Sequence, residues 1–386
     1  MKTAARMAHL ATHFFAALNA RLTAMQSEGR DIIRLDEGSP DLPPAPHIIE
    51  ALVRSARRAD THSYQPHRGS QALREAWAGW YQSQLGVRVD PETEIMPLLG
   101  SKEGIFHLSQ ALLDPGDLAL APDPGYVTYR RGALFAGAEL QTFPLVAERG
   151  YLPDLEAIPA ETLRRAKIMW LNFPNNPTAA SATLAFFEQA VALARRYGFL
   201  LCHDAAYIRI NFGDSHPPSV LQVQGAQDVA VEFNTLSKSH NMAGWRTGAM
   251  LGNPQAIRTL FTLKTNADSS HFRPIFEATT AALSGDQSWL DQRNEVYRQR
   301  RDAVLSGLKQ IGLEPATPQA SLYVWTSAPA GWECEQFAES ALDKTGVSLT
   351  PGTVFGEGGK GFLRISITAP LERIQEAMGR LKDWLG

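Results

Sequence analysis

From about residue 95 this chain alternates short apolar runs with longer segments in which apolar residues recur every three or four positions. The first pattern indicates buried strands, and the second indicates helices with one buried face. Strands that are apolar throughout and separated by helices favour a mainly parallel sheet with both faces covered. The expected strands are Ile95–Leu99, Leu118–Ala121, Glu139–Phe143, Ile168–Asn172, Phe199–His203, Val229–Phe233 and Gly248–Leu251. The clearest helical repeats are Ile105, Leu108 and Leu112, and then Leu184, Phe187, Val191 and Ala194.

The pattern changes after about residue 285. Trp289–Ile311 is typical of one long helix, and strand-like Leu322–Thr326 and Phe362–Ile367 precede an amphipathic helix at Leu371–Leu385. Because 386 residues are too many for one ordinary core, we expect two domains. The large α/β domain spans 46–288, and a smaller α+β domain combines 1–45 with 289–386. An N-terminal helix at residues 5–29 is expected to pack with the smaller domain.

Composition excludes several classes of protein. The net charge of −3 gives no basic field for nucleic acid, and no apolar run approaches the length of a membrane span. Cys202 and Cys334 are far apart, which does not indicate a disulfide, and no His/Cys cluster has the spacing of metal ligands. Lys2, Arg6 and His9 interrupt the N-terminus, so it lacks the apolar centre of a signal peptide. We expect a cytoplasmic enzyme without a metal.

Polar residues follow four of the expected strands. Gly100-Ser101-Lys102 comes after the first strand, Asn172–Thr178 after the fourth, Asp204 after the fifth and Thr235–Lys238 after the sixth. Parallel sheets bind ligands beyond the carboxyl ends of their strands. This agreement between topology and chemistry predicts one ligand site at that edge of the sheet.

Lys238 is the most specific of these residues, because it lies among hydroxyl residues just after a buried strand. A desolvated amine near other cations loses its proton readily and can then form an imine with an aldehyde. Arg246, eight residues on, could meet a phosphate. Pyridoxal 5'-phosphate (PLP) carries an aldehyde and a phosphate on one small ring. The alternative is a surface loop that happens to hold Lys and Arg.

Other segments could complete such a site. Gly100–Gly104 offers free N–H groups at a helix start, although Ser101 could equally be an ordinary N-cap. Tyr126 ends a Pro- and Gly-rich loop and could stack on a flat ring, or be a half-buried loop tyrosine. Two prolines stiffen the turn that carries Asn176, which favours a ligand contact over a simple turn.

Asp204 and Arg364 are charged residues in apolar strand contexts. Asp204 ends a strand and needs a partner, for which a protonated pyridine nitrogen is suitable. Tyr207 could then hydrogen-bond the phenolic oxygen of the ring. Otherwise Asp204 caps the next segment. Arg364 lies mid-strand and suits a carboxylate, the alternative being a salt bridge within the protein.

Together these segments resemble the class I/II aminotransferases of the fold-type-I PLP enzymes over nearly the whole chain. They are most similar to LL-diaminopimelate aminotransferases and the related succinyldiaminopimelate and alanine enzymes. The resemblance is carried by Leu35-Asp36-Glu37-Gly38-Ser39-Pro40-Asp41, Tyr64, Gly100–Gly104, Pro124-Gly125-Tyr126, Asn176-Pro177-Thr178, Asp204 with Tyr207, Lys238 with Arg246, and Arg364.

The resemblance implies a role for each residue. Lys238 forms the imine with PLP and acts as base and then acid, while Asp204 pairs with the pyridine nitrogen. Asn176 and Tyr207 contact the ring oxygen, and Tyr126 stacks on the ring. The remaining implied contacts are Ser101, Lys102, Thr235, Ser237 and Arg246 at the phosphate, Tyr64 at the phosphate of the neighbouring subunit in a homodimer, Arg364 at the substrate α-carboxylate, and Gly38 and Asn176 beside the substrate.

The implied reaction is transamination from an L-amino acid to a 2-oxo acid such as 2-oxoglutarate. A diaminopimelate-like or other dicarboxylic donor is favoured. The same fold also serves β-lyases, decarboxylases and alanine- or aspartate-type aminotransferases. PLP-binding regulators carry a DNA-binding module ahead of the part that resembles these enzymes. In this sequence the resemblance begins within the first few dozen residues and the net charge is slightly acidic, so a regulator is disfavoured. A nucleotide enzyme is disfavoured because no Gly-x-Gly-x-x-Gly follows the first strand.

Two positions depart from the pattern of the family. Ala179 stands where glycine usually follows Asn-Pro-Thr, which tightens the backbone there. The segment Asp268–Pro274 contains Arg273 where relatives are neutral, which leaves side-chain specificity open. Lys264 and Arg273 could face a distal carboxylate of the substrate, or both could be surface charges.

Overall fold

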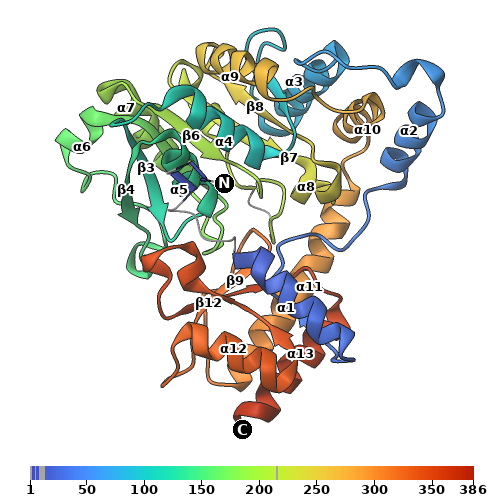
Figure 1. Cartoon of the computed structure of the whole chain (residues 1–386), viewed down its shortest axis with the longest axis vertical. Helices are drawn as coiled ribbons and strands as arrows, with labels where there is room; N and C mark the ends of the chain where they lie inside the picture. The colour runs from blue at the N-terminus through green and yellow to red at the C-terminus, as the bar shows by residue number, and fades with distance from the viewer. Residues whose placement is uncertain (1, 5, 8–13, 214–215) are drawn as a thin grey trace.

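The computed structural model describes residues 2–4, 6–7, 14–213 and 216–386. Its centre is a seven-stranded sheet in the order β2-β8-β7-β6-β5-β3-β4 (Figure 1). The strands from β7 to β4 run parallel, and β8 is antiparallel to both of its neighbours. The α/β fold with a mainly parallel sheet is therefore confirmed. The strands are β2 (Ile95–Leu98), β3 (Leu118–Asp123), β4 (Glu139–Pro144), β5 (Ala166–Asn172), β6 (Leu200–Asp204), β7 (Ala230–Thr235) and β8 (Gly248–Gly252).

Helices cover both faces of this sheet, as side-chain alternation along the strands requires. In β5, Ile168 and Trp170 belong to one apolar cluster, whereas Met169 and Leu171 belong to the other. The first cluster includes residues of α4 (Ser101–Leu112), α5 (Val127–Ala136) and α9 (Pro254–Ala267). The second includes residues of α2 (Pro46–Ala56), α3 (Gln71–Leu85), α6 (Ala160–Arg165), α7 (Leu184–Tyr197), α8 (Leu236–Ser239) and α10 (Arg273–Ser284).

One expected strand differs in character from the prediction. Glu139–Phe143 was expected among strands that are apolar throughout, but β4 is mostly exposed, with Phe143 as its buried residue. The reason is helix cover, because β4 forms one edge of the sheet and packs mainly on α5, whereas β2 at the other edge is covered by α3, α4 and α9 and is buried throughout. An edge strand covered on few sides needs few apolar residues.

A smaller sheet lies below the large one in Figure 1, in the order β11-β12-β9. The predicted long helix is confirmed as α11 (Trp289–Gln310), and α13 (Leu371–Leu385) has the predicted bounds. The strands are β9 (Tyr323–Ser327), β11 (Thr350–Pro351) and β12 (Phe362–Ser366), with α12 (Cys334–Thr345) beside them. A short parallel pair joins β1 (Ile33–Arg34) to β10 (Val347–Ser348).

The N-terminal helix packs with this lower part, as expected. In α1 (Phe14–Ser27), Leu22 and Met25 form a cluster with Ile32 and Leu342 of α12. Residues 5 and 8–13 of the predicted helix lie outside the described residues. We propose that the domains divide at 46–288 against 1–45 and 289–386. The two main apolar clusters largely follow this division, although Ala206, Tyr207, Ile210 and Phe212 of the large domain pack into the cluster of the smaller domain. No helix among the described residues is both long and apolar enough to cross a membrane.

Two glycines in the lower part test how tightly α11 packs on α13. A Cβ added to Gly307 in α11 would lie 2.4 Å from both Cβ and Cγ of Met378, whereas one added to Gly379 in α13 meets nothing within 4 Å. Gly307→Ala should lower the free energy of unfolding by about 1–3 kcal/mol through overpacking. Gly379→Ala, the matched control, should raise it by about 0.5–1 kcal/mol because alanine favours a helix. Urea unfolding measures both, and equal effects would contradict the packing.

Candidate active site

A cavity of about 530 Å³ lies beyond the carboxyl ends of the parallel strands. The register places Asn172 at the end of β5 beside Asp204 at the end of β6, and α8 begins directly after β7. The structure thus brings together the polar groups that the sequence placed after separate strands. The described lining residues are Phe15, Asn19, Arg34, Glu37, Gly38, Ser39, Ser101, Lys102, Tyr126, Val127, Asn172, Asn176, Asp204, Ala206, Tyr207, Thr235, Ser237, Lys238, Arg246, Tyr323, Phe355 and Arg364.

Lys238 lies in the single turn α8 and points its amine into the cavity. Its Nζ donates a hydrogen bond to the carbonyl oxygen of Gly38, which lies in the N-terminal segment 1–45. Burial lowers the pKa of Lys238 to about 8, and the cations Arg364 and Arg246 add to the effect. A substantial fraction of the amine is therefore neutral near pH 8, as a nucleophile or proton acceptor must be.

Asp204 is a buried carboxyl group with one satisfied oxygen. Its Oδ2 accepts a hydrogen bond of 2.8 Å from the hydroxyl of Tyr129, while Oδ1 has no partner among the described residues. Burial raises the pKa of Asp204 to about 6. Tyr129 stacks on Trp170 with ring centroids 5.1 Å apart, which holds the hydroxyl in place. The free oxygen is a site for a positively charged donor.

The turn before α4 differs from the predicted alternative for Ser101. Gly100 is the N-cap, with φ at 82°, and Ser101 is the first helical residue, so its side chain does not cap the helix. A Cβ at position 100 would lie 2.4 Å from Nη2 of Arg246. Glycine therefore permits both the left-handed backbone and the approach of Arg246 to the helix start.

The hydroxyl residues around Lys238 are joined by hydrogen bonds. The Thr235 hydroxyl donates to the carbonyl oxygen of Thr247 at 2.8 Å and accepts from the N–H of Ser237 at 3.2 Å. Burial lowers the pKa of Lys102, with Arg131 and Arg246 as further causes. Cations, hydroxyls and the start of α4 thus converge on one end of the cavity, which suits an anion.

The three asparagine side chains of the stiff turn after β5 have different hydrogen-bond partners. Asn172 accepts from the N–H of Asn176 at 2.8 Å and donates to the carbonyl oxygen of Asp204 at 2.7 Å. Asn175 accepts from the N–H and hydroxyl of Thr178. Asn172 and Asn176 both line the cavity, and the side-chain oxygen of Asn176 accepts a hydrogen bond from Nη1 of Arg364 at 3.0 Å. The side chains of Asn172 and Asn175 thus stabilise the turn, and that of Asn176 contacts Arg364 in the site.

Ala179 adopts a left-handed backbone, with φ at 61°. Glycine tolerates this conformation without cost, whereas a residue with a Cβ is strained there by roughly 1 kcal/mol. The departure from glycine expected from the sequence therefore adds local strain, while Asn176 keeps its place in the cavity.

Arg364 projects from β12 and is 3% exposed. Its Nη2 donates to the carbonyl oxygen of Asp36 at 2.6 Å, and its guanidinium lies 4.2 Å from the ring centroid of Tyr323. None of the ion pairs among the described residues includes Arg364, so the alternative of an internal salt bridge does not hold. A buried guanidinium bonded only to neutral groups suits an incoming carboxylate.

Tyr129 and Tyr323 are site residues that the sequence did not reveal. The Tyr323 hydroxyl lies 2.8 Å from that of Tyr207, and its ring packs on Arg364. A signal existed for Tyr129, which lies three residues after Tyr126 and so close to it on α5. Tyr323 follows no motif, because it comes from a strand of the lower sheet.

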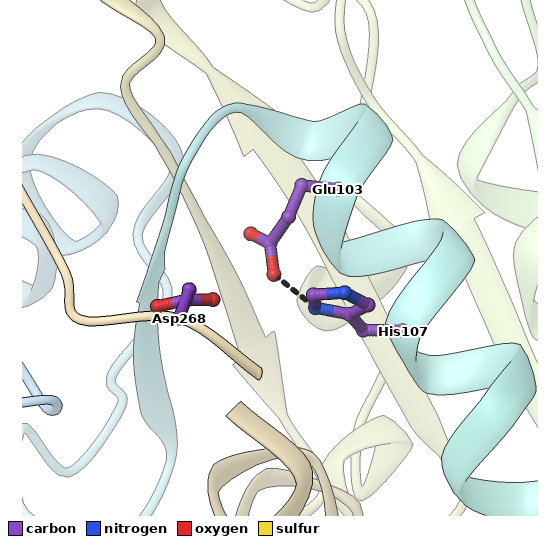
Figure 2. A group of neighbouring side chains, drawn as sticks. All are labelled: Glu103, His107 and Asp268. Atoms are coloured by element: carbon purple, nitrogen blue, oxygen red, sulfur yellow. Dashed lines mark ion pairs between the residues drawn. The ribbon is translucent and has the colours of Figure 1, made fainter. Parts of the chain in front are cut away.

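Lys264 was predicted either to face a distal carboxylate or to lie on the surface, and both predictions were wrong. It is 2% exposed, and its Nζ donates to Glu103 at 2.8 Å and to Asp268 at 2.7 Å. Figure 2 shows the Glu103 carboxylate paired with His107, with Asp268 nearby. These three could share a metal by distance, but the Lys264 ammonium already bonds to two of them.

Arg273 and Tyr64 do not line the cavity of this chain. Arg273 is partly exposed and pairs with Glu277 at 3.0 Å and Asp60 at 3.5 Å, so it is a surface charge here. Tyr64 is 90% exposed. Its expected reach toward a neighbouring subunit stays a prediction.

Comparisons with known proteins match this chain over nearly its whole length. The family model described as aminotransferase class I and II matches residues 30–381. The LL-diaminopimelate aminotransferase of Desulforudis audaxviator is 46% identical over 383 residues, covering 99% of this chain and 98% of that protein. The one from Moorella thermoacetica is 44% identical over 386 residues, covering 100% and 99%.

Solved structures match over the same length. The substrate-bound structure of BacF from Bacillus subtilis has a TM-score of 0.97 and 37% identity, covering 100% of this chain and 98% of that one. A probable N-succinyldiaminopimelate aminotransferase from Thermus thermophilus has a TM-score of 0.90 and 35% identity, covering 96% and 99%.

The buried carboxyl of Asp204 should make the unliganded protein sensitive to pH. Its pKa is raised to about 6, so the protonated form stabilises the fold below about pH 4. That stability is lost as the pH rises through about 6. As the pH rises from about 5 to about 8, wild type should therefore lose stability relative to Asp204→Asn, by about 1–1.5 kcal/mol.

Urea unfolding of both unliganded proteins at the two pH values measures this change. Asp383→Asn, which alters an exposed carboxyl of α13, is the control and should track wild type. A constant difference between Asp204→Asn and wild type would contradict the assignment.

Proposed function

This chain belongs to the class I and II aminotransferase family, and from that membership we propose that it is a PLP-dependent enzyme that moves an amino group from an L-amino acid to a 2-oxo acid. The observation that carries the proposal is the convergence of Lys238, Asp204 and Arg364 on one cavity. They supply an amine with a lowered pKa, a buried carboxyl oxygen without a partner among the described residues, and a buried guanidinium that bonds there only to neutral groups.

The cavity fits PLP in its donor set. The free Oδ1 of Asp204 would hold the protonated ring nitrogen, and Tyr126 would lie against the ring. Asn176 and Tyr207 would contact the ring oxygen. The group that would hold the phosphate comprises Ser101, Lys102, Thr235, Ser237 and Arg246, all of which line the cavity.

PLP supplies an aldehyde that condenses with amines and a ring that draws electron density from the substrate Cα. The protein supplies the proton transfers and the orientation. Lys238 Nζ takes the Cα proton of the donor and later gives a proton back, which its pKa of about 8 permits in both directions. Arg364 holds the α-carboxylate, and Asp204, paired with a cation, stays ionised.

The names of the relatives support a diaminopimelate-like or other dicarboxylic donor, while 2-oxoglutarate as the acceptor stays a prediction from the sequence. Two relatives above 40% identity are LL-diaminopimelate aminotransferases, and one structural neighbour is a probable N-succinyldiaminopimelate aminotransferase. Neither Lys264 nor Arg273 supplies the distal contact in this chain, because both are engaged by carboxylates. The contact must come from other residues of the cavity.

A homodimer is part of the proposal, with Tyr64 reaching the phosphate of the neighbouring subunit. Its exposure of 90% supports this, because aromatic side chains that are largely exposed in a single chain are enriched at interfaces. The cytoplasmic location stays a prediction from the sequence.

Lys238→Ala should abolish the visible absorption band of bound PLP and lower turnover by about 10⁴-fold or more, since the variant lacks both the imine-forming amine and the proton carrier. The measurement is the absorption spectrum together with 2-oxo acid formation from an amino acid panel. Lys309→Ala, a substitution in the last turn of α11, is the control and should behave as wild type. Full activity of Lys238→Ala would end the proposal, and release of ammonia by the wild type would indicate a lyase.

Mixing two inactive variants tests the shared site. In a hybrid of Lys238→Ala and Tyr64→Ala protomers, one site has an intact Lys238 from one subunit and an intact Tyr64 from the other. The hybrid should recover tight PLP binding at one site per dimer, measured by titration with the cofactor. If Tyr64 acts within its own chain, no mixture recovers it.

A further inference from the structure

The cavity walls carry one pair of oppositely charged residues that has no role in binding the cofactor or the substrate α-carboxylate. Once those groups have their partners, the charged residues that remain among the described lining residues are Arg34 and Glu37. Both also line a second pocket of about 420 Å³, together with Asp41, Thr368 and Arg373. The pair therefore stands where the cavity meets a neighbouring space.

Glu37 lies close to the reacting amine. It directly precedes Gly38, whose carbonyl oxygen accepts the hydrogen bond from Lys238. Consecutive Cα atoms are about 3.8 Å apart, so the carboxylate is within a side chain's reach of the amine. The Glu37 charge opposes the lowering of the Lys238 pKa, as a nearby anion does. The Glu37 carbonyl oxygen accepts from the Thr368 hydroxyl at 2.8 Å, which holds the backbone in place.

The two side chains differ in how far they are engaged. Arg34 binds the buried carboxylate of Asp36 through Nε at 3.1 Å and Nη2 at 2.6 Å, so its guanidinium is fixed. Its Nη1 lies 3.6 Å from Glu37, which is too long for a hydrogen bond. The Glu37 side chain is 51% exposed. One carboxylate and one N–H edge are thus available side by side.

The other charged groups of the second pocket are already paired. Asp41 accepts from Arg300 at 2.7 and 2.9 Å. Arg373 bonds to Asp31 at 2.6 Å and also pairs with Glu376. A ligand that extends out of the cavity therefore meets Arg34 and Glu37 as the less committed charges.

We propose that Glu37 and Arg34 read the far end of the amino donor, and that this end carries both an ammonium and a carboxylate. This rests on the proposed function and narrows the donor to diamino dicarboxylic acids such as diaminopimelate. With the α-carboxylate at Arg364 and Cα at Lys238, the donor's side chain extends toward the remaining walls. Its distal ammonium pairs with Glu37 and its distal carboxylate with Nη1 of Arg34.

The same pair selects against simpler donors. A donor that ends in a carboxylate alone brings two negative charges together at Glu37, with no ammonium to offset them. A donor that ends in an apolar group would remove water from both charges without replacing its hydrogen bonds. Glu37 is thus a specificity-determining residue, while Arg34 supplies the matching contact.

The test compares two donors on the PLP-loaded enzyme. L-2-aminopimelate has the seven-carbon chain and distal carboxylate of LL-diaminopimelate but lacks the distal ammonium. Wild type should show kcat/KM at least about tenfold higher for LL-diaminopimelate, the effect of one hydrogen bond between charged groups. Glu37→Gln should lower kcat/KM for LL-diaminopimelate about tenfold and leave L-2-aminopimelate unchanged or improved, which brings the ratio close to one.

Two controls separate the possible failures. Glu314→Gln removes an exposed carboxylate outside both pockets and should keep the wild-type ratio. Alanine, a donor without a distal group, reports whatever effect Glu37→Gln has on Lys238 itself, so kcat/KM for LL-diaminopimelate is compared with that for alanine in each protein, and this ratio should fall about tenfold in Glu37→Gln. A wild type that does not distinguish the two pimelates, or a Glu37→Gln that slows all donors by one factor, overturns the proposal. A wild type that accepts no amino donor overturns the proposed function instead.

Discussion

The buried carboxyl of Asp204 is the constraint on which the rest of the site depends. It ends the middle strand of a sheet, where water is excluded, and Tyr129 satisfies only one of its oxygens. A chain selected for stability alone would place an apolar group there or pair both oxygens. The raised pKa of about 6 shows the cost of leaving one oxygen free. A cationic partner would remove that cost, so binding of a cationic group in the cavity should stabilise the fold.

The second requirement is that the two parts of the chain meet at this point. Lys238 donates to Gly38, and Arg364 bonds to Asn176 and to the carbonyl of Asp36, so contacts between distant segments place the amine and the guanidinium on one cavity. The same contacts set Glu37 beside Lys238, which links the proposed reading of the donor's far end to the geometry of proton transfer.

The strength of each local pattern explains what could be predicted. Strands β5, β6 and β7 are continuous apolar runs, so their positions and the polar residues at their ends followed directly from the chain. The edge strand β4 was misjudged, because exposure depends on which neighbours a strand finds. Lys264 was misjudged for a similar reason, since Glu103 precedes it by 161 positions and no local pattern relates the two. Tyr323 carried no motif at all.

The sequence by itself determined the fold class, the family resemblance and the residues at the strand ends, because periodicity and short motifs are local properties. Only the tertiary structure decided which charged side chains are held by partners within the protein and which can still bind a ligand. It engaged Lys264 and fixed Arg34, and it left Arg364 and Glu37 available. Glu103 reaches Lys264 from 161 positions away in the chain. Asp36 and Asp268 are near neighbours of Arg34 and Lys264 in the sequence, but the local pattern does not show that these side chains meet, because packing sets their direction.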